Sequence, residues 1–153
     1  MTTTLESAER IKIYKTSPEL YDAMMALSNA AAKDIDVELG ELIKIRASQI
    51  NHCAFCLDMH TRDARKHGVS EQKLDVLAAW EEAGHLFNER ERAALALTEA
   101  ITELDDGHVP DAVYQRAAQV FSDRELGQVI AMAVTIKAWN RIYVTYRLQP
   151  PTR

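Results

Sequence analysis

The sequence contains few of the residues that interrupt helices. Only five glycines and four prolines occur among its 153 residues. No stretch shows the alternation of apolar and polar residues that is typical of a half-buried strand. Long apolar runs are absent as well, so we expect no helix that spans a bilayer. Residues 1–10 are polar and lack the apolar centre of a secretory signal, which makes the cytoplasm the expected location.

A surplus of positive charge is also missing. The formal net charge is -5, which argues against non-specific binding to nucleic acid and against docking on an anionic membrane surface. The glycine-rich loops that bind nucleotides and the G-x-S-x-G turn of serine hydrolases do not occur.

The remaining pattern is helical almost throughout. A chain of 17.2 kDa with 47% hydrophobic residues suits one domain, residues 1–153, with a real core. Asn88 with Glu91, and Ser122 with Glu125, resemble capping boxes at helix starts. We therefore predict an all-α fold with helices at about 18–32, 37–50, 53–68 and 123–147, and others beginning near Ser70, Asn88 and Pro110.

Both cysteines of the chain lie in one short motif. Glu41, Cys53, Cys56 and His60 form the pattern E-x11-C-x2-C-x3-H. If a helix begins at Cys53, the two cysteines are neighbours on it, close enough for a reversible disulfide. The unpaired N–H groups and the positive dipole of a helix start favour a thiolate over a thiol. In a reducing compartment such a pair is typical of redox catalysis or metal binding.

His60 and Glu41 are suited to move protons to and from these thiols. His60 lies one helical turn after Cys56, so its imidazole can exchange a proton with a reacting sulfur. If the helices before and after residues 51–52 form an antiparallel hairpin, Glu41 lies about 15 Å from the turn and His60 about 13 Å from it. Val37 and Ile45 flank Glu41 at i-4 and i+4, so we expect an inward-facing carboxylate with a raised pKa. The pattern thus predicts a proton relay from Glu41 through His60 to the cysteines.

A structural zinc site is the competing interpretation of this motif. C-x2-C-x3-H supplies three potential ligands, and a fourth could come from His52, His67, His85 or His108. Structural zinc sites usually join two separated pairs of ligands, and the sequence has no second pair. Taken singly, the four motif residues would be ordinary structural residues, but four chemically matched groups in one hairpin favour a redox site.

Two further groups of residues have structural interpretations. Trp139, Tyr143 and Tyr146 recur at helical spacing, and we predict that they belong to the core or to a subunit interface. His67 lies at the end of the third predicted helix, where an imidazole favours the negative end of the helix dipole. Gly68 then provides the left-handed residue that ends this helix.

The stretch from Glu41 to Gly68 resembles the core of the alkylhydroperoxidase D (AhpD) family, part of the larger carboxymuconolactone decarboxylase group. The segment Ala-Trp-Asn-Arg at 138–141 also resembles short members. The resemblance implies an all-helical fold and a peroxidase that reduces organic hydroperoxides without a cofactor or metal. It also implies trimers or hexamers, and an external dithiol reductant, with a lipoylated protein as one candidate.

The resemblance assigns roles that residue chemistry leaves open. It makes Cys56 the peroxidatic thiol, Cys53 the resolving thiol, and Glu41 and His60 the proton relay, whereas Cys53 is the nearer of the two thiols to the helix end. The best-known members carry a second histidine immediately before the later cysteine, and here that residue is Phe55. A disulfide reductase or redox adaptor with weak peroxidase activity is therefore an alternative. A decarboxylase is less favoured, because that chemistry needs no C-x2-C pair.

Overall fold

The computed structural model describes residues 9–153, and these form helices and connecting turns without a strand. This confirms the all-α prediction and the helices expected near 18–32, 37–50, 53–68 and 123–147. The prediction about the secretory signal concerns residues 1–10 and falls largely outside the described part. The elements in chain order are α1 Ile13–Thr16, α2 Pro18–Ala31, α3 Val37–Ile50, α4 Ala54–Lys66, α5 Glu71–Val76, η1 Leu77–Glu82, η2 Gly84–Leu86, α6 Glu89–Glu103, α7 Asp111–Val120 and α8 Asp123–Tyr146.

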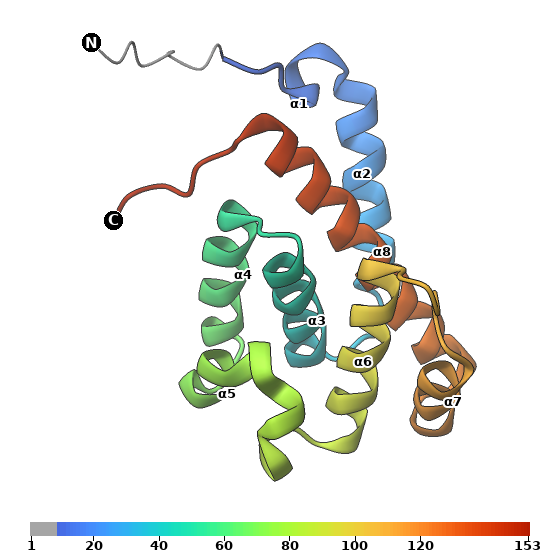
Figure 1. Ribbon diagram of the computed structural model, residues 1–153. Helices are drawn as coiled ribbons and strands as arrows, with labels where there is room; N and C mark the ends of the chain where they lie inside the picture. The colour runs from blue at the N-terminus through green and yellow to red at the C-terminus, as the bar shows by residue number, and fades with distance from the viewer. Residues whose placement is uncertain (1–8) are drawn as a thin grey trace.

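Helix α3 lies at the centre of the fold, with α4, α6 and α8 packed around it (Figure 1). Leu39 and Ile43 join one apolar cluster with α6, α7 and α8. Leu42 and Ile45 join a second cluster with α4, α5, η1 and α6. Between these apolar sides α3 carries polar residues: Glu41 faces α4, Ser48 faces α8, and Arg46 pairs with Glu99 on α6. The single-domain prediction for residues 1–153 stays a prediction.

Local sequence determines several helix ends. The capping boxes at Asn88–Glu91 and Ser122–Glu125 are both formed, each with the side-chain and backbone bonds that define the motif. Gly68 follows α4 with a φ of 99°, a conformation that glycine adopts without a steric penalty. A Cβ atom at this position would also lie 3.1 Å from Glu38 Oε1. The end of α4 is therefore fixed in the way the sequence predicts.

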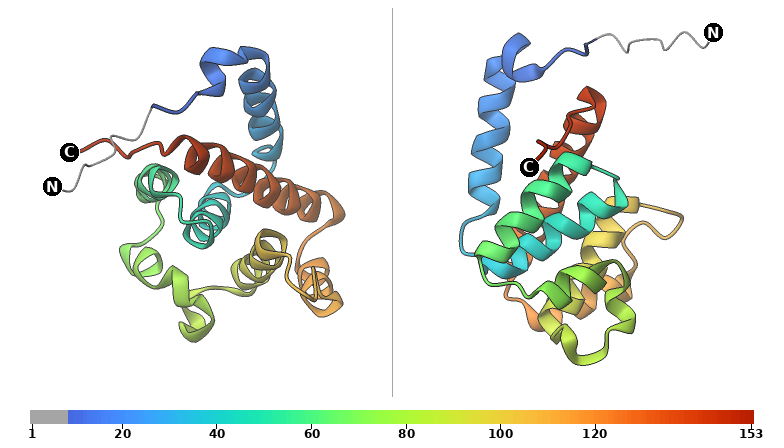
Figure 2. Two further views of the ribbon diagram at one scale, coloured as in Figure 1. Left: turned by 45° about the horizontal axis from the view of Figure 1, so that its top comes forward. Right: turned by 90° about the vertical axis from the view of Figure 1, so that its left-hand side faces the viewer.

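Helix α2 is the least buried of the long helices. It packs along α8 at the edge of the fold, as two further views show (Figure 2), and Ala31 is its only buried residue. Leu20, Met25 and Leu27 are exposed on it. Among the helices of residues 9–153, none has both the length and the apolar character needed to cross a membrane.

Candidate active site

The two cysteines lie where the α3–α4 hairpin turns. Cys53 is the N-cap residue of α4 and Cys56 lies in its first turn. Their sulfurs are joined in a disulfide, with the Cα atoms 5.3 Å apart. The backbone N–H of Cys56 donates to Cys53 Sγ at 3.3 Å. The structure confirms the predicted pair at a helix start, where N–H groups and the helix dipole favour negative charge on sulfur.

Both sulfur-bearing residues are closed off from solvent. Cys53 is 2% exposed and Cys56 is 0% exposed. Protons and electrons that reach the sulfurs must therefore pass through neighbouring groups or through a local opening. A disulfide also has no thiolate to offer a metal, so the zinc hypothesis can apply only to the reduced chain.

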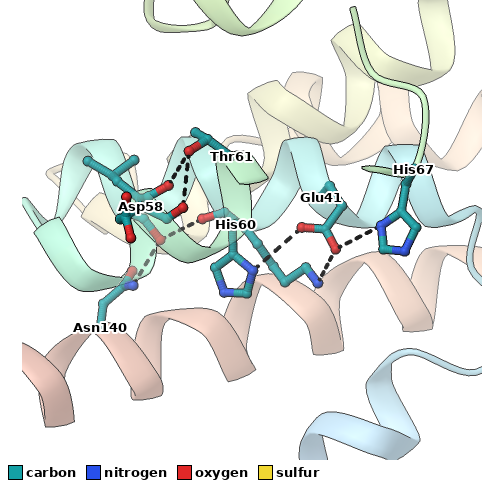
Figure 3. A network of polar contacts seen from close by, with 9 residues as sticks. Glu41, Asp58, His60, Thr61, His67 and Asn140 are labelled. Atoms are coloured by element: carbon teal, nitrogen blue, oxygen red, sulfur yellow. Dashed lines mark hydrogen bonds and ion pairs between the residues drawn. The ribbon is translucent and has the colours of Figure 1, made fainter. Parts of the chain in front are cut away.

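Glu41 is the centre of a buried polar cluster on α3. The residue is 3% exposed, which confirms that it faces inward, although Val37 at i-4 is itself exposed. Lys44 Nζ donates to Glu41 Oε1 at 2.9 Å. His60 Nδ1 lies 3.5 Å from Oε2, and His67 Nδ1 lies 3.6 Å from Oε1 (Figure 3). The hairpin thus brings Glu41 level with His60, as the helix arithmetic predicts.

The expectation of a raised pKa at Glu41 is wrong. Burial has the largest single influence and raises the pKa, but hydrogen bonding and charge from His60 and Lys44 together outweigh it. The net pKa of Glu41 lies below its ordinary value. The carboxylate therefore stays ionised and places a negative charge beside the imidazoles of His60 and His67.

His60 connects this cluster to the cysteines. It is 9% exposed and lies four residues after Cys56 on α4, hence on the same face of the helix. Its Nδ1 atom and Glu41 Oε2 have no hydrogen-bond partner among the described residues. At 3.5 Å they are farther apart than the usual 2.7–3.2 Å of an N–H···O bond. A small side-chain shift would bring the two atoms within hydrogen-bond distance, an arrangement that suits proton transfer.

A second polar network fixes the hairpin from α8. Asn51 Nδ2 donates to Asn140 Oδ1 at 3.0 Å, and Asn140 Nδ2 donates to Ser48 Oγ at 2.9 Å. Ser48 Oγ in turn donates to the backbone oxygen of Lys44 at 2.7 Å. Asn140 and Ser48 are completely buried. These bonds hold the last turn of α3, and with it the start of α4, against α8.

The motif did not point to Lys44 or to the Asn140 network, and it gave His67 only the roles of a helix-end residue and a potential zinc ligand. Lys44 follows Glu41 at i+3, and His67 follows His60 at i+7, so both spacings place these side chains near the predicted relay. Helix periodicity could have found them. Asn140 falls in the segment 138–141 that resembles short family members, but that segment does not reveal its partners, which lie about ninety positions away in the sequence.

An apolar cavity of about 220 Å³ adjoins the site. His60 and Lys44 form its polar wall, and its lining comes from α2, α3, α4 and α8. Trp139 and Tyr143 also line it, so they form part of a cavity wall rather than a solid core. Burial raises the pKa of Tyr143 to about 12, which keeps its phenol protonated at neutral pH. An apolar space thus lies directly beside the proposed proton relay.

One group of three potential metal ligands lies at this site among the described residues. Glu41, His60 and Asp63 bring single ligand atoms within 4.8 Å of one another. However, the ammonium of Lys44 already lies 2.9 Å from the Glu41 carboxylate. A cation at this position would be repelled by Lys44, so the arrangement suits proton transfer better than metal binding.

Comparison with known proteins gives consistent results. A model of the carboxymuconolactone decarboxylase family matches residues 18–100. The uncharacterized protein YdfG of Bacillus subtilis is 38% identical over 138 residues, which cover 90% of this chain and 93% of YdfG. Alkyl hydroperoxide reductase AhpD of Hyphomonas neptunium is 36% identical over 53 residues, only 35% of this chain and 28% of that protein.

A solved structure is similar over nearly the whole chain. It is the crystal structure of an Agrobacterium tumefaciens protein of unknown function, named as a candidate AhpD antioxidant-defence protein. The TM-score is 0.89 at 37% identity, and the match covers 95% of this chain and 100% of the other. The AhpD-like fold expected from the residues around the cysteines is thereby confirmed.

Proposed function

The chain belongs to the carboxymuconolactone decarboxylase family, and on this premise we propose that it is a thiol-dependent peroxidase that reduces organic hydroperoxides. One observation supports the proposal most strongly. A disulfide at a helix start lies one helical turn from a buried imidazole, which itself faces an ionised carboxylate. Thiol peroxidation needs these parts, namely a thiolate, a second thiol and a proton donor.

The oxidative half of the proposed cycle uses both cysteines. The Cys56 thiolate attacks the terminal oxygen of the hydroperoxide, and the O–O bond breaks. His60 gives a proton to the departing alkoxide, so the products are an alcohol and a sulfenic acid on Cys56. The Cys53 thiol then attacks this sulfur, which releases water and forms the disulfide. The position of His60 one turn after Cys56 supports the choice of Cys56 as the attacking thiol.

The reductive half needs an external dithiol. One of its thiolates attacks the disulfide to give a mixed disulfide, and the second displaces the enzyme. Cys53 takes up a proton as it leaves, whereas Cys56 is released as the thiolate for the next cycle; we assign the proton transfer to the relay of Glu41 and His60. We propose that the reductant is a dithiol, for example on a lipoylated protein. We also propose that this protein is located in the cytoplasm, where such dithiols stay reduced.

We also propose that the protein assembles into a trimer or hexamer. The exposed apolar side chains of α2 support this, since a 14-residue helix with a single buried residue gains stability when a second copy covers it. Light scattering on the purified protein gives the number of subunits. A monomer at micromolar concentration would contradict the proposal.

The decisive experiment is peroxide consumption with dithiothreitol as the dithiol. Wild type is compared with Cys56→Ser and Cys53→Ser, using cumene hydroperoxide as the substrate. We expect Cys56→Ser to abolish turnover, and Cys53→Ser to stop after one equivalent with a sulfenic acid that dimedone traps. Full turnover by Cys56→Ser, or an unchanged thiol count after peroxide treatment, would overturn the mechanism.

A disulfide reductase or redox adaptor is the second candidate function. Phe55 supports it, because the residue before Cys56 packs its ring against Tyr143 and has no polar group to offer a peroxide. Turnover on cumene hydroperoxide compared with turnover on an aromatic model disulfide separates the two candidates. Preference for the disulfide by a hundredfold or more would favour the second.

A further inference from the structure

Glu41 contacts two imidazoles, one from each of its carboxylate oxygens. Figure 3 shows Glu41 between His60, toward the start of α4, and His67, at its end. The distances are 3.5 Å from Oε2 to His60 Nδ1 and 3.6 Å from Oε1 to His67 Nδ1. The side chains of His60 and Glu41 are 11% and 4% exposed, whereas that of His67 is 45% exposed. The three groups thus form a row that leads from the buried site to solvent.

The end of α4 holds His67 in this position. Its backbone N–H donates to the carbonyl oxygens of Asp63 at 3.0 Å and Ala64 at 3.1 Å. Gly68 then turns the chain away with a positive φ. His60 and His67 are seven residues apart, close to two helical turns, so both project toward α3 from one face of α4. A histidine kept only for the helix dipole would need no partner on α3.

The chemistry of the site requires a connection of this kind. Reduction of the disulfide produces two thiolates, on residues that are 2% and 0% exposed; Cys56 stays a thiolate for the next attack on peroxide, whereas Cys53 must be protonated. Glu41 and His60 together can supply one proton before another proton must reach them from outside. Both residues are buried, so this proton cannot come directly from solvent. The charged or titratable groups that face this pair are Lys44, Asp63 and His67. Among these groups, only His67 has an imidazole, a side chain with one nitrogen that can donate a proton and another that can accept one.

We propose that His67 is the proton-exchange residue that connects the buried Glu41–His60 pair to solvent. The proposal rests on the function proposed above and concerns the same site. When His60 gives its proton to a leaving cysteine thiolate, a proton passes from His67 through Glu41 to His60, and His67 takes a new proton from water. His67 touches no reacting atom, so it is a positioning residue that acts through Glu41.

The test measures reduction of the disulfide and needs no peroxide. Oxidised protein is mixed with excess dithiothreitol in dilute phosphate, samples are quenched with an alkylating reagent, and the rate is followed by mass. We expect His67→Ala and His67→Gln to react about tenfold more slowly, a smaller loss than the roughly hundredfold or more of a missing general acid. Free imidazole should restore the rate of His67→Ala in a saturable manner and leave the wild-type rate unchanged. His85→Ala, an exposed histidine on η2, is the matched control and should behave as wild type.

Each outcome decides the proposal. Slower reduction with rescue by imidazole supports it, because a purely structural residue is not replaced by a diffusing base. Wild-type rates in both variants, or a loss that imidazole does not restore in protein with a wild-type circular dichroism spectrum, would overturn it. His67→Gln keeps a polar side chain beside Glu41 and serves if His67→Ala fails to fold. Failure of the peroxidase proposal is seen separately, as absence of peroxide turnover by wild type.

Discussion

The ring of Phe55 packs edge-on against the ring of Tyr143, with the two centroids 5.1 Å apart. Tyr143 in turn stacks on Trp139 at 5.3 Å. The residue immediately before Cys56 is therefore held by an aromatic column that continues into the cavity wall. The best-known AhpD proteins carry a histidine at this position. In this chain an apolar contact takes the place of one hydrogen-bonding group near the dithiol.

Phe55→His is expected to increase peroxide turnover and to lower stability. An imidazole beside Cys56 adds a proton acceptor, for which we expect a gain of about tenfold in kcat. Loss of the aromatic contact costs about 0.5–1.5 kcal/mol of unfolding free energy. Peroxide assays and urea unfolding measure the two effects. Phe55→Leu is the control, since it loses the ring without gaining a proton acceptor, and equal rates for both variants would contradict the prediction.

Glu41→Gln is expected to lower turnover about a hundredfold, because an amide cannot accept and release the proton that the proposed relay passes through Glu41. The variant also leaves Lys44 without its carboxylate partner, at a cost of about 1–2 kcal/mol, a modest value because Lys44 reaches solvent. Steady-state kinetics and urea unfolding measure both changes. Glu19→Gln, on the exposed surface of α2, is the control. Retention of half the wild-type kcat by Glu41→Gln would exclude Glu41 from the relay.

Asn140→Ala is expected to destabilise the protein by about 1–3 kcal/mol, because Ser48 and Asn51 lose their hydrogen-bond partner in a buried position. The start of α4 should also become less well positioned, so that disulfide formation after oxidation slows. Urea unfolding and quenched-flow alkylation give the two quantities. Asn29→Ala, at an exposed position of α2, should change neither. An unfolding free energy equal to that of wild type would show that the network contributes nothing.

Glu125 is expected to contribute to stability at neutral pH and to lose this contribution in acid. Hydrogen bonds from the Arg90 side chain and from the Ser122 backbone lower its pKa from 4.5 to about 2. The pKa of Glu125 is lower in the folded protein than in the unfolded chain. Its contribution to the free energy of unfolding is therefore complete above pH 4.5 and disappears as the pH falls through about 2.

Glu125→Gln measures this contribution. The variant should unfold at a lower urea concentration than wild type at neutral pH, and the difference should shrink in acid as wild-type Glu125 is protonated. Glu103→Gln, an exposed carboxylate at the end of α6, is the control. A difference between Glu125→Gln and wild type that stays constant down to the acid limit would contradict the assignment.

Local sequence patterns predicted the parts of the site that depend on neighbouring residues. The spacing of Cys53, Cys56 and His60 along one helix is enough to place them together, since 3.6 residues complete a turn. The position of Cys53 as an N-cap and of Gly68 beyond the last turn likewise follow from short-range backbone geometry. Counting the helical rise from the turn at residues 51–52 also places Glu41 level with His60, because a short turn leaves little freedom between two antiparallel helices.

By itself the sequence determined the helical class, the helix ends, the dithiol at a helix start and the level of Glu41 with His60. Only the tertiary structure decided the charge state of Glu41, which depends on the balance between burial and its cationic neighbours. It also decided that Asn140 anchors the hairpin and that Trp139 and Tyr143 line a cavity. The reason is physical: backbone periodicity acts over a few residues, whereas desolvation and long-range hydrogen bonds exist only after distant helices have packed together.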